Sequence, residues 1–254
     1  MSQPLLVVDA LSKSFGGVHA LRDVSFDVSP GETVAMIGPN GAGKTTCFNV
    51  IHGELAPDGG HVRFAGRTLL RQPPHVIAQR GIGRTFQVAA TFASMTVRES
   101  VAVALATRER RDRSAATKML QTRSAEIDAL LLRLRIDDVA DAHCAALAYG
   151  DGKRLELAMA LALAPRLLLM DEPTAGMTPR SRRDLMTLAT SLAERDNVAV
   201  LFTEHDMDIV FGFADRILVL DRGALIAAGS PAEIKADPRV NAVYLGLDEP
   251  APDQ

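Results

Sequence analysis

Continuous apolar runs alternate along the chain with segments whose apolar residues are spaced as in a helix. Residues 33–37, 167–170 and 198–203 are runs of this kind, and such runs are typical of parallel strands that are covered on both faces of a sheet. Between the last two runs, Thr178 and Pro179 are suited to the N-cap and the first residue of a helix. The pattern therefore predicts an α/β fold built on a largely parallel sheet.

A second group of short segments predicts antiparallel strands. Residues 5–10 alternate weakly between apolar and polar, which predicts an edge strand, and residues 24–28 are its expected antiparallel partner. A turn signal at residues 57–60 precedes a further predicted strand at 61–65. A hairpin is expected near the C-terminus, across residues 221–223.

The stretch from about residue 97 to residue 146 differs from the rest of the chain in composition and in the spacing of its apolar residues. It is rich in Ala, Leu and Arg, and it places apolar residues at helical spacing, as at Ile127, Leu131 and Leu134. This pattern predicts an inserted helical subdomain. An arginine cluster inside it is interpreted as a solvated helix face or loop in preference to a binding patch; it comprises Arg108, Arg110, Arg111 and Arg113.

Composition narrows the class of protein. With 254 residues, 47% of them apolar, the chain can bury one large core or two modest ones. A net charge of −3 and a pI near 6.1 disfavour a nucleic-acid partner, which would normally require a basic surface. Two cysteines are too few for a disulfide framework and favour a reducing compartment. The first residues lack the basic and apolar regions of a signal peptide.

One apolar stretch, residues 155–170, invites comparison with a membrane segment. It contains Glu156, Pro165 and Arg166, so it falls short of the roughly 20 apolar residues that a spanning helix needs. We expect instead a buried helix, a break at the proline and a buried strand, in a soluble chain.

Residues 38–46 read Gly-Pro-Asn-Gly-Ala-Gly-Lys-Thr-Thr, between a predicted strand and a predicted helix. In this context the pattern predicts a phosphate-binding loop. The glycines allow close approach of the backbone, and the loop N–H groups and the helix dipole favour an anion. Lys44 adds a point charge on the phosphates, and the Thr45 hydroxyl can ligate Mg²⁺. The chain is therefore predicted to bind a nucleoside triphosphate through Asn40, Gly41, Ala42, Gly43, Lys44, Thr45 and Thr46.

Two carboxylates follow the predicted strand at residues 167–170. Asp171 lies where this strand ends, and ligands of α/β proteins bind at the carboxyl ends of the strands. There Asp171 can hold Mg²⁺ opposite Thr45, and Glu172 can orient and deprotonate the water that attacks the γ-phosphate. The alternative is a helix cap or a solvated loop. The phosphate-binding loop in the same chain favours the catalytic interpretation.

Several motifs occur in the order that one protein family shows. Gln87 is followed by Leu-Ala-Tyr-Gly-Asp at 147–151, then by Asp-Glu-Pro at 171–173 and Glu-His-Asp at 204–206. With the phosphate-binding loop, these motifs resemble the nucleotide-binding subunit of ABC transporters over residues 5–247. The resemblance implies a P-loop NTPase fold, with a RecA-like core, an antiparallel β subdomain and an inserted α-helical subdomain. It implies one cassette over residues 1–247, with the helical subdomain at 88–146, the core and β subdomain at 1–87 and 147–247, and a flexible tail at 248–254.

The resemblance also implies roles for individual residues. Ala148 and Gly150 belong to the signature motif, which opens a helix and points its N-terminus at ATP held by a second subunit. A helix dipole that faces a phosphate is physically favourable. Phe15, otherwise a candidate for core filler, is then expected to stack on adenine. With ATP and Mg²⁺ as cofactors, the expected catalytic residues are Glu172, His205 and Gln87, and the expected metal-binding residues are Thr45, Gln87 and Asp171.

Two departures from the common family pattern are predicted to affect the site. In the signature, Ala148 replaces a serine and Tyr149 replaces a glycine. Loss of one hydroxyl contact to a charged phosphate costs about 1.5–3 kcal/mol, which weakens closure of the site by roughly tenfold to a hundredfold. The backbone donors and the helix dipole remain. Further on, Met177 and Thr178 replace a Leu-Asp pair, so the aspartate of the dimer interface is missing here.

The departures are similar to those of the branched-chain amino acid importer branch. The Ala-Tyr-Gly signature, residues 84–87 and 204–207, and a closing Tyr-Leu-Gly at 244–246 carry this resemblance. It implies two polytopic membrane subunits, a second ATPase subunit and a periplasmic-type solute-binding protein. The expected assembly is a nucleotide-sandwich heterodimer, with a homodimer as the alternative. This chain resembles the larger ATPase type and is expected at the cytoplasmic face of the membrane, as a peripheral protein.

Three alternatives belong to other classes. A soluble ABC-type ATPase that acts on nucleic acid or ribosomes is disfavoured by the single cassette, the absence of heptads and the acidic pI. A degenerate cassette that binds ATP as a scaffold is disfavoured by four intact residues of the site, which are Lys44, Asp171, Glu172 and His205. An exporter or lipid transporter is disfavoured only by the resemblance at the level of the branch.

Overall fold

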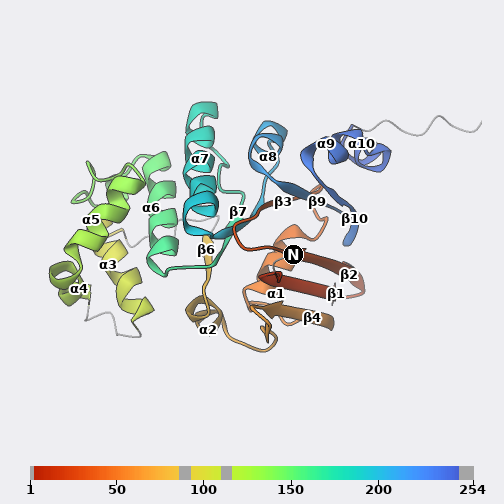
Figure 1. The fold of residues 1–254 in the computed structure, drawn as a ribbon, viewed down its shortest axis with the longest axis horizontal. Helices are drawn as coiled ribbons and strands as arrows, with labels where there is room; N and C mark the ends of the chain where they lie inside the picture. The colour runs from red at the N-terminus through yellow and green to blue at the C-terminus, as the bar shows by residue number, and fades with distance from the viewer. Residues whose placement is uncertain (1–2, 86–92, 110–115, 246–254) are drawn as a thin grey trace, which may run out of the picture.

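The computed structural model describes residues 3–85, 93–109 and 116–245. At its centre lies a six-stranded sheet in the order β10-β9-β3-β8-β7-β6 (Figure 1). The strands are β3 (Thr33–Ile37), β6 (Ile82–Thr85), β7 (Leu167–Asp171), β8 (Ala199–Thr203), β9 (Arg216–Asp221) and β10 (Ala224–Gly229). All neighbours pair in parallel except β10, which pairs antiparallel with β9. The apolar runs and the hairpin therefore form the elements that were predicted.

Both faces of this sheet are covered, because successive side chains of a strand point to opposite faces. In β8, Val200 and Phe202 belong to a core shared with α7 (Pro179–Asp196) and α8 (Met207–Phe213), while Leu201 belongs to the core on the other face. That second core contains α1 (Lys44–Ile51) and a second sheet. Figure 1 shows α7 and α8 above the central sheet and α1 below it. This covering explains why all residues of β3, β7 and β8 are buried.

The second sheet is antiparallel, in the order β2-β1-β4-β5. Its strands are β1 (Leu6–Phe15), β2 (Val18–Val28), β4 (Gly59–Phe64) and β5 (Arg67–Thr68). The predicted pairing of residues 5–10 with 24–28 is confirmed, since Leu6 lies opposite Val28. The prediction of an edge strand at 5–10 is wrong, because β1 also pairs with β4 and places Leu6 opposite Phe64. Alternation along a strand indicates which face is buried, but not whether a second strand binds its other edge.

The helical segment gathers at one end of the molecule. It consists of α3 (Val97–Arg108), α4 (Ala116–Thr122) and α5 (Ser124–Arg133). Of these, α3 and α5 pack against α6 (Tyr149–Ala162), and α4 packs on α3 and α5 (Figure 1). The helical spacing is confirmed, because Ile127, Leu131 and Leu134 are fully buried. Arg108 forms an ion pair with Glu126 at 2.9 Å and so links α3 to α5; the other members of the arginine cluster lie outside the described residues.

The remaining helices are short. Within the described residues they are α2 (Pro74–Gln79), α9 (Pro231–Ala236) and α10 (Pro238–Leu245), and a 3₁₀ turn at Cys144–Ala146 leads into α6. Residues 155–170 divide into the end of α6, a break at Pro165 and β7, as predicted. The tail predicted at 248–254 lies outside the described residues.

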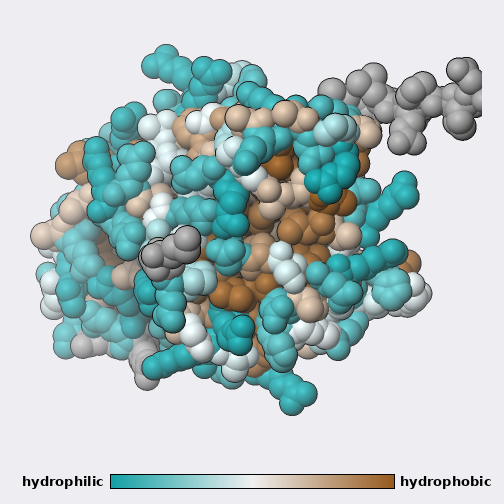
Figure 2. Space-filling view, turned by 45° about the vertical axis from the view of Figure 1, so that its right-hand side comes forward, coloured by the Kyte–Doolittle hydropathy of each residue, from teal (hydrophilic) through white to brown (hydrophobic). Residues whose placement is uncertain are grey.

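The described helices include none that is both long and apolar enough to cross a membrane. The face in Figure 2 is mainly hydrophilic, with apolar side chains gathered near its middle.

Candidate functional site

The loop at residues 38–46 lies at the carboxyl end of β3 and leads into α1, with Gly43 as the helix N-cap. Two of its glycines lie against backbone oxygens of other elements. A Cβ on Gly38 would lie 2.2 Å from the Leu220 oxygen, and one on Gly43 would lie 2.4 Å from the Ala20 oxygen. Gly43 also has a φ of 106°, which larger residues rarely adopt. The loop can therefore hold this shape only with glycine at both positions.

The lysine of the loop lies across the loop's own backbone. Lys44 Nζ donates hydrogen bonds to the Gly38 oxygen at 2.6 Å and to the Pro39 oxygen at 3.2 Å. Burial lowers the pKa of Lys44, and the charges of Glu172 and Asp171 oppose that effect. No side chain caps α1, and its first turn has no acidic residue. A positive charge and an uncapped helix N-terminus thus meet at one place, which suits an anion.

The carboxylate of Asp171 is held on both of its oxygens. Asp171 ends β7 and is buried. Its Oδ1 accepts a hydrogen bond of 2.7 Å from Thr203 Oγ1, at the end of β8. Its Oδ2 lies 3.5 Å from Arg84 Nη2. The orientation of this carboxylate is therefore set by two neighbouring strands before any ligand binds.

The sequence did not identify Arg84 or Thr203 as functional residues. Arg84 is 6% exposed, and its Nη1 lies 3.3 Å from Glu54 Oε1, so the guanidinium bridges two acidic residues. Pairing of β6 with β7 places Arg84 opposite Leu169, two residues before Asp171. The available signal was a charged residue in an otherwise buried strand, because a buried charge needs a partner.

We expect Arg84→Met to lower the free energy of unfolding by about 3 kcal/mol, near the low end of the range for breaking a buried ion pair. Chemical denaturation of the full chain measures this change. Arg80→Met is the matched control, because the Arg80 side chain donates a bond of 2.7 Å to the exposed Thr68 oxygen and not to a buried carboxylate; about 1 kcal/mol is expected there. Equal effects of the two substitutions would contradict the assigned role of Arg84.

Glu172 and His205 lie in direct contact. His205 Nε2 is 2.7 Å from Glu172 Oε1. Glu172 has a φ of 46°, and its N–H bonds to Thr203 Oγ1 at 3.0 Å, so the backbone of Glu172 is tied to β8. Two residues selected from separate motifs are thus brought together at the carboxyl edge of the sheet.

The segment after Glu172 is tied to the segment around His205. The Thr174 N–H and hydroxyl donate to Glu204 Oε1 at 2.9 and 2.7 Å, and both residues are buried. Arg182 of α7 pairs with Asp206 at 2.7 Å. The buried bonds between Thr174 and Glu204 fix the relative positions of the two segments, and the half-buried pair of Arg182 and Asp206 adds a second link.

The remaining candidates lie at three places. Ala148 is the N-cap of α6, and Ala148 and Tyr149 are exposed. Phe15 ends β1 with 47% of its surface exposed, and Lys13 Nζ lies 5.4 Å from the centre of its ring. In the loop, Asn40, Gly41 and Thr45 are exposed, Thr46 is half-buried and Ala42 is buried. Gln87 lies outside the described residues.

A glycine-rich loop after one buried strand, with the carboxylates of another at the same sheet edge, defines the class of protein as a P-loop nucleoside triphosphatase. Comparison with known proteins is more specific. The ABC transporter family matches residues 21–175, and a branched-chain amino acid ATP-binding cassette transporter family matches residues 224–249. The chain therefore belongs to the ABC transporter family, as the subunit that binds ATP and couples its hydrolysis to transport.

Individual relatives cover nearly the whole chain. It is 40% identical to the high-affinity branched-chain amino acid transport ATP-binding protein LivG of Salmonella typhimurium, over 97% of this chain and 99% of that protein. It is 39% identical to the corresponding protein BraF of Pseudomonas aeruginosa, with the same coverage of 97% and 99%. Its structure resembles the ADP conformation of MJ1267, an ATP-binding cassette of an ABC transporter, with a TM-score of 0.83 and 29% identity over 96% of this chain and 100% of that one. The predicted fold and family are confirmed.

Proposed function

We propose that the chain hydrolyses ATP to drive the import of branched-chain amino acids or of related small amides and carboxylates. The observation that carries this proposal is the match of residues 224–249 to the branched-chain amino acid cassette family. The relatives named for high-affinity branched-chain amino acid transport support it too. The C-terminal match favours neither a soluble ATPase nor the ATP-binding subunit of an exporter.

The phosphate-binding loop would hold the triphosphate of ATP. Support comes from the tight path of the loop, where a Cβ at Gly38 or Gly43 would collide with backbone oxygens of other elements. The uncapped N-terminus of α1 supports it too. Lys44 would bind the β- and γ-phosphates, and the other loop residues would supply main-chain and hydroxyl contacts. Phe15 would stack on adenine, because its half-exposed ring stands at the end of β1. The loop residues with this role are Asn40, Gly41, Ala42, Gly43, Thr45 and Thr46.

Thr45 and Asp171 would hold Mg²⁺, with Gln87 as a further ligand. Hydroxyl and carboxylate oxygens suit this hard cation, which binds proteins through few side chains together with substrate phosphates. When bound, Mg²⁺ neutralises charge on the phosphate oxygens. The bonds from Thr203 and Arg84 support this role, because they hold the Asp171 carboxylate in one orientation.

Glu172 would accept the proton of the attacking water. His205, at 2.7 Å, would keep the Glu172 carboxylate in place and contact the γ-phosphate, while Gln87 would report the occupied site to the membrane partner. The start of α6, with Ala148 and Gly150, would complete the site of a second subunit. Its exposure supports this, since a surface that closes on another subunit must be accessible.

The assembly follows from these roles. We propose one cassette over residues 1–247, with the helical subdomain at 88–146 and a tail at 248–254. The cassette would pair with a different ATPase subunit on the cytoplasmic face of the membrane. Two polytopic membrane subunits and a periplasmic-type solute-binding protein would complete the importer.

The experiment that tests this function is purification of the membrane complex through a tag on this chain. We expect a second cassette and two membrane proteins to copurify. In liposomes with the binding protein, ATPase activity is expected to rise with leucine, isoleucine, valine or a small amide. Stimulation by a lipid, or recovery of the chain without membrane proteins, would contradict the proposal.

A further inference from the structure

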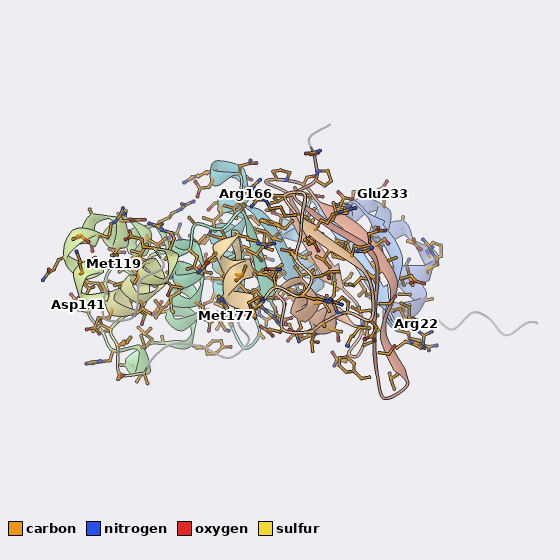
Figure 3. The ribbon with its side chains drawn as sticks, turned by 90° about the horizontal axis from the view of Figure 1, so that it is seen from below. Arg22, Met119, Asp141, Arg166, Met177 and Glu233 are labelled. Atoms are coloured by element: carbon orange, nitrogen blue, oxygen red, sulfur yellow. The ribbon has the colours of Figure 1, made fainter. Side chains whose placement is uncertain are left out.

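The two departures from the common family pattern, at the signature and after Glu172, lie next to each other in space. Tyr149 Oη donates a hydrogen bond of 2.9 Å to the Ala175 oxygen. A Cβ on Gly150 would lie 3.8 Å from Met177 Cε. Figure 3 places Met177 between the helical end, marked by Met119 and Asp141, and the β end, marked by Arg22. The start of α6 therefore rests on the loop formed by residues 175–178.

The tyrosine ring lies against the backbone of that loop. A Cβ on Gly176 would be 3.5 Å from Tyr149 ring atoms and from its hydroxyl oxygen. Gly176 has a φ of 76°, a conformation that glycine adopts at little cost. Tyr149 nevertheless keeps 56% of its surface exposed, so it is not a core residue. The Lys153 ammonium, one turn further along α6, lies 5.8 Å from the ring centre.

The other side of the loop is tied to the residues around His205. Arg182 Nε donates to the Met177 oxygen at 2.9 Å, and Arg182 Nη1 donates to Asp206 Oδ2 at 2.7 Å. Asp206 follows His205, which contacts Glu172. A continuous set of contacts thus joins the start of α6, the loop at 175–178 and the Glu172–His205 pair within one chain.

We propose that Tyr149 is a positioning residue that locks the start of α6 to the loop at 175–178. Two segments that face the second cassette then keep a fixed spacing when the nucleotide sandwich closes. Where the common pattern has a glycine, this chain has Tyr149, whose hydroxyl binds the Ala175 oxygen of the loop. The inference rests on the proposed function, because it concerns closure of a two-cassette site.

The test uses Tyr149→Phe, which removes only the hydroxyl, and Tyr149→Gly, which restores the residue common in the family. In the purified transporter complex, kcat for ATP is expected to fall about two- to tenfold with Tyr149→Phe, the factor for one neutral hydrogen bond. The decrease is expected to be larger with Tyr149→Gly. The Kd of the isolated chain for a fluorescent ATP analogue is expected to stay within about twofold, because Tyr149 lies outside the phosphate-binding loop. Leu132→Ala, at a residue 64% exposed on α5, is the control and is expected to change neither quantity.

Hydrogen exchange supplies a second readout. Backbone amides of residues 175–178 are expected to exchange several-fold faster in Tyr149→Phe than in the parent chain, with exchange in α5 unchanged. An unaltered kcat, or unaltered exchange at 175–178, would overturn the inference. Equal losses in kcat and in affinity for the analogue would also overturn it, since they would indicate general damage to the fold. Absence of ATPase activity in the unmodified complex would instead refute the proposed function, and that outcome is seen before any variant is made.

Discussion

Replacing Glu172 with glutamine is expected to lower the ATPase kcat of the transporter complex by about 10²- to 10⁴-fold, the range for loss of a general base. Glutamine has nearly the same shape but cannot accept the proton of the attacking water. Affinity for ATP is expected to persist, because Lys44 and the phosphate-binding loop are unchanged. The variant is therefore expected to accumulate in an ATP-bound, two-cassette state, which analytical ultracentrifugation measures alongside phosphate release.

Glu194→Gln is the control for charge, because Glu194 lies exposed near the end of α7. Its kcat is expected to match that of the parent chain. His205→Ala removes the residue 2.7 Å from Glu172 and is expected to lower kcat without abolishing nucleotide binding. Full hydrolysis by Glu172→Gln, with the site of the partner cassette silenced, would remove Glu172 from its proposed role.

Replacing Lys44 with alanine is expected to weaken ATP binding by about tenfold to a hundredfold. This is the factor for a hydrogen bond to a charged group, about 1.5–3 kcal/mol. Turnover is expected to fall further, because the same ammonium neutralises charge that develops on the phosphates. Equilibrium titration of the isolated chain with a fluorescent ATP analogue measures the first effect, and phosphate release by the complex measures the second.

Folding of the Lys44→Ala chain is expected to be nearly unchanged. Burial lowers the pKa of Lys44, so the native protein bears a cost for charging this amine, and alanine removes that cost together with the two bonds to loop carbonyls. Lys118→Ala, at an exposed position on α4, is the matched control and is expected to bind the analogue like the parent. Analogue affinity in Lys44→Ala equal to that of the control would contradict the phosphate site.

Local patterns in the sequence determined the elements and the chemistry of the phosphate-binding loop. The strand Thr33–Ile37 has the predicted bounds. Thr178 caps α7 and accepts a bond from the Ser181 N–H. These features depend on neighbouring residues, because capping, side-chain periodicity and the backbone freedom of glycine act over a few positions. The nucleotide class and the family followed from the same kind of information.

Only the tertiary structure decided which distant residues meet. In the structure, β1 lies between β2 and β4 in its sheet. His205 contacts Glu172, and Arg84 contacts Asp171. The structure also joined Tyr149, in one departure from the family pattern, to Ala175 in the loop that carries the other departure, at Met177 and Thr178. Such contacts depend on strand order, pairing register and helix packing, because these bring together residues that are far apart in sequence. A local pattern can show that a partner is needed, as for the charged Arg84 in a buried strand, but not which residue supplies it.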